Sequence, residues 1–187
     1  MNQIWNLPNI LTIFRIAIIP VLVVVFYLPF AWSYSVSAFL FALACVTDWF
    51  DGFLARKLHL ESPFGAFLDP VADKLLVAVI LILLVAEQGS PLLAMPASVI
   101  VGREIVISAL REWMAEVGNR QKVAVSKIAK WKTGVQMVAI TVLLMEPATA
   151  LTPLLLAGYL LIYIAAGLTL WSMMVYLSIA WKELTKS

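Results

Sequence analysis

The sequence predicts an all-α integral membrane protein with six transmembrane helices and both termini in the cytoplasm. The first observation is composition, because 63% of the 187 residues are hydrophobic and only 13% are charged. A water-soluble domain carries about a quarter charged residues, whereas a mean hydropathy of +0.99 requires lipid as the solvent. The second observation is a series of six apolar stretches. The third is the uneven placement of lysine and arginine between them.

The six stretches approach or exceed the roughly 20 helical residues that a bilayer core requires. They run over Asn9–Leu28, Tyr34–Leu54, Pro70–Ala86, Leu92–Met114, Thr133–Met145 with a backward extension, and Pro153–Trp181. Ser62 and Pro63 suit the N-cap and first turn of a helix, so the third helix is expected to begin there. The connections are short and contain no repeat or linker, so residues 1–187 are expected to form a single membrane domain.

The basic residues indicate the orientation. The connections 29–33, 87–91 and 146–152 contain neither lysine nor arginine. The opposite connections and the tail hold Arg56, Lys57, Arg120, Lys122, Lys127, Lys130, Lys132, Lys182 and Lys186. Because cytoplasmic loops carry the excess of positive charge, both termini and the connections near Arg56 and Arg120 are expected in the cytoplasm.

Four aspartates lie near the cytoplasmic ends of the second and third stretches, where ionisable groups are costly and indicate function. Asp48 and Asp51 are three residues apart, and Asp69 and Asp73 are four apart, so each pair shares a helix face. A short connection makes the two helices antiparallel neighbours. Four converging carboxylates cannot all be ionised without cations between them. Oxygen ligands suit Mg²⁺ or Mn²⁺, or Ca²⁺, and two such ions would clamp a phosphate or pyrophosphate.

Small residues share these faces. Gly52 and Ala55 follow the first aspartate pair by one turn, and Gly65 precedes Asp69 by one turn, which leaves space for a ligand. Arg56 lies one turn beyond Gly52 and can reach a phosphate oxygen. The pattern therefore indicates metal-dependent phosphoryl-transfer chemistry on a lipid.

The polar residues also admit two other interpretations. In one, the four acids form ordinary helix-end ion pairs with Arg56, Lys57 and Lys74. In the other, the aspartates are the transport site of a divalent-cation transporter, but such a route needs polar residues across the whole membrane, and here the outer half of each stretch is apolar. The single cysteine, Cys45, and the single histidine, His59, argue against a metal site built on sulfur or imidazole.

The aspartates belong to a longer pattern. Asp48-Trp-Phe-Asp51-Gly52-Phe-Leu-Ala55-Arg56 is followed after eight residues by Gly65, then at four-residue steps by Asp69 and Asp73. This run resembles the signature D-x2-D-G-x2-A-R-x8-G-x3-D-x3-D of the CDP-alcohol phosphotransferases, and every fixed position is filled. Together with the six-helix plan, the resemblance covers nearly the whole chain.

Three further elements resemble the bacterial members of this family that make phosphatidylglycerol phosphate. They are Leu7–Thr12 followed by Arg15, Arg103–Glu104 with Ser108–Trp113, and Ser126–Thr133. The resemblance implies that CDP-diacylglycerol and sn-glycerol 3-phosphate give phosphatidylglycerol phosphate and CMP. It also implies a multi-pass homodimer in the bacterial inner membrane, with its active site facing the cytoplasm and no nucleic-acid partner. The remaining alternative is a related enzyme with inositol phosphate, serine or phosphatidylglycerol as the acceptor.

The resemblance also implies roles for the signature residues. The four aspartates would hold two divalent metal ions, Mg²⁺ or Mn²⁺, and Asp73 would be the general base for the attacking hydroxyl. The residues expected around the CDP group are Asp48, Gly52, Ala55, Arg56 and Gly65.

The acceptor is a dianion and needs positive charge beyond that used for CDP. Arg103 and Arg111 lie about two turns apart on one face of the fourth helix. The residues expected to bind glycerol 3-phosphate are Arg15, Arg103, Arg111, Lys127 and Lys130. The alternative is structural, with Arg103 paired to Glu104 or Glu112 and Arg111 extending to the membrane interface.

Overall fold

The computed structural model describes residues 7–58, 63–116, 127–147 and 152–184. This part of the chain contains helices and no strand, as predicted. The helices are α1 (Leu7–Phe26), α2 (Ser33–Leu58), α3 (Pro63–Gln88), α4 (Pro91–Glu116), α5 (Lys127–Met145) and α6 (Pro153–Leu184). Ser62, the predicted N-cap of α3, lies outside the described residues.

Each helix contains one of the predicted apolar stretches, with small differences at the ends. α3 begins at Pro63 and α5 at Lys127, which confirms the early start of the third helix and the backward extension of the fifth. Proline also opens α4 and α6, where its missing N–H would have had no helical partner. Between α3 and α4, Gly89 adopts a φ of 56°, and its N–H donates to the Val85 carbonyl at 3.0 Å. Glycine adopts this left-handed conformation without strain, so it ends α3.

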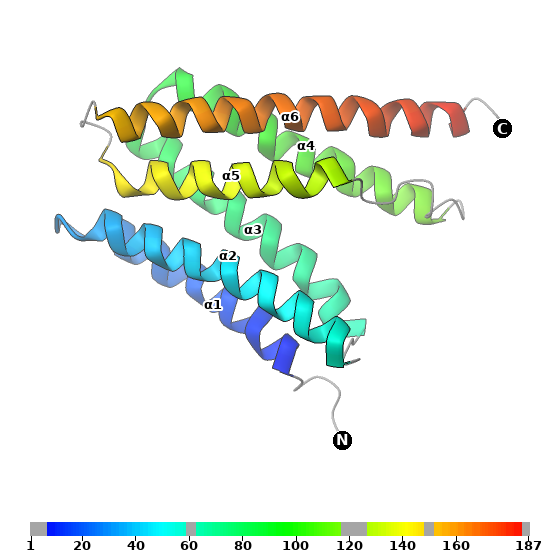
Figure 1. Cartoon of the computed structure of the whole chain (residues 1–187), viewed down its shortest axis with the longest axis horizontal. Coiled ribbons are helices and arrows are strands. Elements are labelled where there is room, and N and C mark those ends of the chain that lie inside the picture. The colour runs from blue at the N-terminus through cyan, green and yellow to red at the C-terminus, as the bar shows by residue number, and fades with distance from the viewer. Residues whose placement is uncertain (1–6, 59–62, 117–126, 148–151, 185–187) are drawn as a thin grey trace.

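Successive helices run in opposite directions (Figure 1). α1 packs on α2 and α3, α2 packs on α5, and α6 packs on α4 and α5. As a result, the described starts of α1, α3 and α5 lie at the same end as the ends of α2, α4 and α6, on the right of Figure 1. That end carries the aspartates of α2 and α3.

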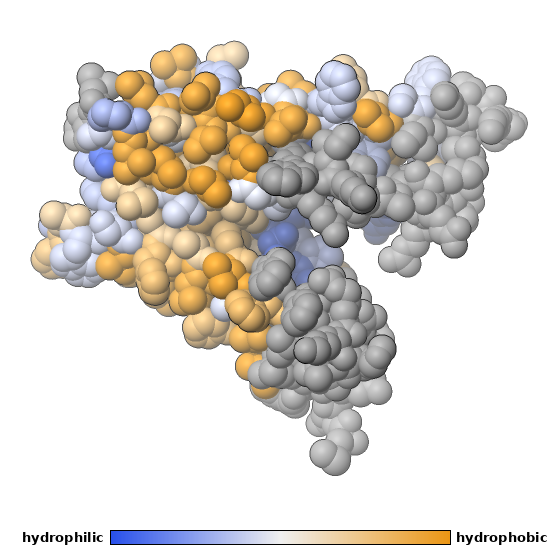
Figure 2. All heavy atoms as spheres, in the orientation of Figure 1, coloured by the Kyte–Doolittle hydropathy of each residue, from blue (hydrophilic) through white to orange (hydrophobic). Residues whose placement is uncertain are grey.

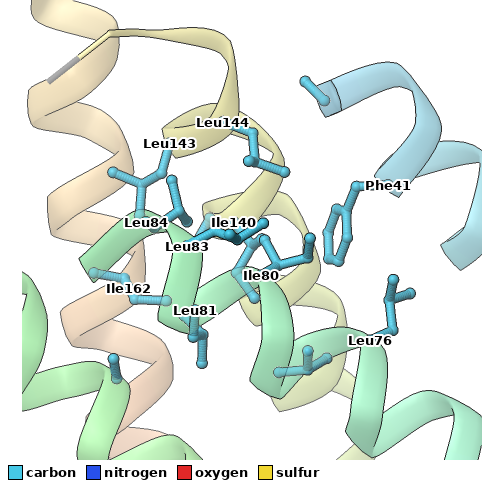
Figure 3. Packing of buried hydrophobic residues seen from close by; sticks show 14 of the residues in the cluster. Phe41, Leu76, Ile80, Leu81, Leu83, Leu84, Ile140, Leu143, Leu144 and Ile162 are labelled. Atoms are coloured by element: carbon cyan, nitrogen blue, oxygen red, sulfur yellow. The ribbon is translucent and has the colours of Figure 1, made fainter. Parts of the chain in front are cut away.

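All six helices contribute to the main buried core cluster, and Figure 3 shows the part of it between α2, α3, α5 and α6. Phe41 of α2, Ile80 of α3, Ile140 of α5 and Ile162 of α6 are all fully buried, and they belong to one cluster. Leu76 of α3 belongs to the same cluster and lies one turn from Asp73. The core therefore anchors the helix that carries the polar residues.

The exterior is apolar, as a lipid solvent requires. Phe39, Ile82, Ile105 and Leu160 are each more than 60% exposed and come from α2, α3, α4 and α6. Within the described part of the chain, three helices contain stretches long and apolar enough to cross a membrane, at Asn9–Phe26, Pro91–Met114 and Pro153–Ser178. Shorter apolar stretches lie at Ser33–Asp48 and Thr133–Met145. Charged residues bound the two shorter stretches, because the one in α2 ends at Asp48 and the one in α5 begins directly after Lys132.

Phe41→Ala should lower the free energy of unfolding in detergent micelles by about 3 kcal/mol, because it leaves a cavity between α2, α3 and α5. The matched control is Phe39→Ala on the same helix, whose side chain is 65% exposed and whose loss should cost less than about 0.5 kcal/mol. Equal losses in the two variants, measured by equilibrium unfolding, would contradict the packing described.

Candidate active site

The structure brings together three of the four predicted aspartates. Asp48 lies in the second half of α2, and Asp69 and Asp73 lie in the first half of α3. Asp73 is within electrostatic range of Asp48 and Asp69, and Asp48 is within range of Asp69. The i, i+4 spacing puts Asp69 and Asp73 on one face of α3. Such a group of like charges is unstable unless positive charge or hydrogen-bond donors compensate it.

α1 supplies both kinds of compensation. Arg15 is fully buried, and its guanidinium forms an ion pair with the Asp48 carboxylate. One turn earlier, Thr12 is also fully buried, and its hydroxyl donates to Asp69 Oδ1 at 2.5 Å. The sequence predicts Arg15 as an acceptor-binding residue, and Thr12 is not among the predicted site residues. The feature of the sequence that could have indicated a role for Thr12 is its position three residues before Arg15, inside an otherwise apolar helix.

The oxygen atoms of Asp48, Asp69 and Asp73 are of the kind that a hard divalent ion binds, since all are carboxylate oxygens. Within the described side chains, no group of three or more His, Cys, Asp or Glu residues is close enough together to hold a metal ion. Asp51 is the fourth predicted ligand, and its side chain is not among those that the structure describes. Metal binding by the four aspartates therefore stays a prediction, because the structure describes the side chains of only three of them.

The residues predicted around CDP are only partly described. Gly65 is buried at the start of α3, one turn before Asp69. Gly52, Ala55 and Arg56 lie on α2 beyond Asp48, but their side chains lie outside the described residues.

α4 brings a buried arginine to the same region. Arg103 is 6% exposed; its Nη1 donates to Glu104 Oε1 at 2.6 Å, and its Nη2 donates to Ser172 Oγ of α6 at 3.3 Å. The Arg103–Glu104 pair is one of the structural alternatives from the sequence. Arg103 Nε is nevertheless buried without a hydrogen-bond partner among the described residues. Glu104 lies within electrostatic range of Asp73, so α4 borders the aspartates.

A second contact connects α3 to α4. The Lys74 ammonium donates to Ser108 Oγ, and the Ser108 hydroxyl donates to the Glu104 carbonyl at 2.7 Å. Lys74 follows Asp73 directly, whereas Glu104 follows Arg103. The contact therefore fixes the predicted base relative to the predicted acceptor arginine, and it gives Lys74 a partner other than the aspartates.

Arg111 lies two turns beyond Arg103 and is exposed. Its guanidinium carbon is 5.8 Å from the centre of the Tyr176 ring on α6, a distance typical of a cation–π interaction. Lys127 and Lys130 lie in the first turn of α5, at the same end of the protein, but their side chains are not described. Figure 2 shows hydrophilic atoms in a hollow at this end, between α1 and α2 on one side and α5 and α6 on the other. The surface beside the hollow is largely hydrophobic.

This arrangement agrees with comparisons to known proteins. Residues 5–176 match the family model described as CDP-alcohol phosphatidyltransferase, and this family generally uses divalent metals. The chain is 54% identical over 180 residues to the CDP-diacylglycerol–glycerol-3-phosphate 3-phosphatidyltransferase of Pseudomonas fluorescens, covering 96% of this chain and 92% of the relative. Enzymes of the same name from Salmonella choleraesuis and Escherichia coli K12 are 55% and 52% identical, covering 94% and 96% of this chain and 95% and 97% of the relatives.

Arg15→Met should destabilise the protein by about 3 kcal/mol in EDTA, because it leaves the Asp48 charge without its partner. Adding Asp48→Asn to that variant should restore at least half of the loss, since the unpaired charge is then gone. Equilibrium unfolding of the two single variants and the double variant measures the coupling. Additive losses would contradict the ion pair.

Proposed function

Because the chain belongs to the CDP-alcohol phosphatidyltransferase family, we propose that it transfers the phosphatidyl group of CDP-diacylglycerol to sn-glycerol 3-phosphate. The products are phosphatidylglycerol phosphate and CMP. The observation that carries this proposal is identity above one half, over nearly the full length, to three bacterial enzymes named for this reaction. The family resemblance drawn from the signature is thereby confirmed.

In this proposal, Asp48, Asp51, Asp69 and Asp73 hold two divalent ions, Mg²⁺ or Mn²⁺, which would neutralise the pyrophosphate charge of the donor. Asp73 accepts the proton of the primary hydroxyl of glycerol 3-phosphate. The hydroxyl oxygen forms a bond to the β-phosphorus of the donor as the bond to the CMP oxygen breaks. The residues proposed to bind the CDP group of the donor, from which CMP departs, are Asp48, Gly52, Ala55, Arg56 and Gly65.

The acceptor phosphate is bound on the α4 side of the aspartates, by Arg103, Arg111, Lys127 and Lys130. The unpaired Nε of Arg103 supports this assignment, because a buried N–H without a partner favours an anionic ligand. Ser172 and Glu104 hold the other guanidinium nitrogens and so orient it. Arg15 is also predicted to bind the acceptor. It pairs with Asp48, a proposed CDP-binding residue, so it lies on the donor side of the acceptor pocket.

All six helices cross the membrane in this proposal, and both termini lie in the cytoplasm. Its support is the alternation of helix direction (Figure 1) together with the concentration of basic residues at one end of the helices. The active site then faces the cytoplasm of a bacterial inner membrane, and the acyl chains of the donor stay in the bilayer. Residues 1–187 form a single membrane domain, and the family resemblance supports a homodimer.

Asp73→Asn should lower the rate of CMP release by about 10²- to 10⁴-fold, because the amide cannot accept the hydroxyl proton. The assay contains purified protein in detergent, CDP-diacylglycerol, glycerol 3-phosphate and Mg²⁺, and EDTA should abolish release from the unmodified protein. Glu87→Gln is the control, because Glu87 lies at the other end of α3, where it accepts a hydrogen bond from Tyr34. An active Asp73→Asn protein would contradict the assignment of the base.

Arg111→Met should raise the KM for glycerol 3-phosphate by roughly 10- to 100-fold, the loss expected for one charge-assisted hydrogen bond. The KM for CDP-diacylglycerol should stay within about twofold, because the donor is bound by α2 and α3. Inositol phosphate and serine should not support CMP release from the unmodified protein. An equal rise in both KM values, or release with either other acceptor, would refute the acceptor pocket.

A further inference from the structure

α1 carries three buried polar side chains along one side of an otherwise apolar helix. Asn9 is 1% exposed, and Thr12 and Arg15 are fully buried. They are spaced three residues apart, so they follow one another along a single strip of the helix surface. Polar side chains inside an apolar bundle are costly unless hydrogen bonds or charges compensate them, so their partners explain why they are there.

The partners of Thr12 and Arg15 are predicted metal ligands on two different helices. Arg15 pairs with Oδ1 of Asp48 on α2, and Thr12 donates to Oδ1 of Asp69 on α3. α1 packs against both of these helices. One face of α1 therefore contacts a carboxylate from each side of the proposed metal site.

Each contact restricts the rotation of a carboxylate that would otherwise turn away from its negative neighbours. A carboxylate has two oxygens, so a contact through Oδ1 leaves Oδ2 able to bind a cation. The Arg15 charge also offsets the repulsion between Asp48, Asp69 and Asp73 before any metal binds. Hydrogen-bond partners of this kind orient ligating carboxylates, and their loss typically weakens metal binding 10- to 100-fold.

We propose that Thr12 and Arg15 are positioning residues of the divalent-metal site, which orient Asp69 and Asp48 and thereby set its metal affinity. This inference rests on the proposed function, because it requires that the aspartates bind metal. It concerns α1, which carries no residue of the aspartate signature. It also distinguishes two roles for Arg15, which are binding of the acceptor phosphate and orientation of Asp48. If Arg15 only bound the acceptor, its substitution would leave the metal affinity unchanged.

The test is metal binding by the full-length protein in detergent, without substrate. Mg²⁺ is titrated while the thermal unfolding midpoint is followed, because a ligand that binds the folded protein raises that midpoint. Thr12→Val should raise the half-saturating Mg²⁺ concentration at least about tenfold, whereas Thr12→Ser, which keeps the hydroxyl, should stay within about threefold. Thr141→Val is the matched control, because the Thr141 hydroxyl donates to the Met137 carbonyl of its own helix at 2.8 Å.

A Thr12→Val protein whose Mg²⁺ dependence equals that of the unmodified protein would overturn the proposal, even if the variant were less stable. If the unmodified protein itself showed no stabilisation by Mg²⁺ or Mn²⁺, the proposed metal site would fail, which is a separate result. Should Thr12→Val not yield folded protein, Arg15→Lys decides, because lysine keeps the charge but lacks the guanidinium fork. An unchanged half-saturating concentration in that variant would also overturn the proposal.

Discussion

Negative charge gathered at one end of an apolar bundle is the constraint on which the rest of the structure depends. Asp48, Asp69 and Asp73 lie within range of one another's charges, and all three are partly buried, so water screens those charges only in part. The fold answers with Arg15, a fully buried guanidinium on α1, and with the Thr12 hydroxyl. α1 therefore does more than anchor the chain in lipid, because it makes the acidic centre tolerable before any cation binds.

α3 connects this acidic centre to the rest of the protein. Its second half packs Leu76 and Ile80 into the core between α2, α5 and α6, whereas its first half carries Asp69 and Asp73. The carboxylates thus stand on a helix whose position the core determines, which suits a site that must hold its geometry closely. The Lys74–Ser108 contact extends that rigidity to α4 and to Arg103. The residues proposed to bind the donor and the acceptor are therefore connected through packed helices.

The helices and the meeting of the aspartates could be predicted from sequence because both follow from local spacing. Apolar stretches give the helices, Pro63 marks the start of α3, and the i, i+3 and i, i+4 intervals put each aspartate pair on one face. The partners of Arg15 and Thr12 could not be predicted, because spacing within α1 does not say which helices pack against it. The same holds for Ser172, which reaches Arg103 from α6 across 69 residues. The pairing of Arg103 with Glu104 was foreseeable as an alternative, since the two residues are adjacent.

Electron paramagnetic resonance of Mn²⁺ bound to the purified protein tests the central claim most directly, because it reports the metal and its neighbours without requiring catalysis. The account predicts that the folded protein binds two Mn²⁺ ions close enough together for their spins to couple. Asp69→Asn should remove that coupling while the helical content, measured by circular dichroism, stays the same. Folded protein that binds no Mn²⁺, or whose coupled signal survives Asp69→Asn, would contradict an acidic centre built to hold metal.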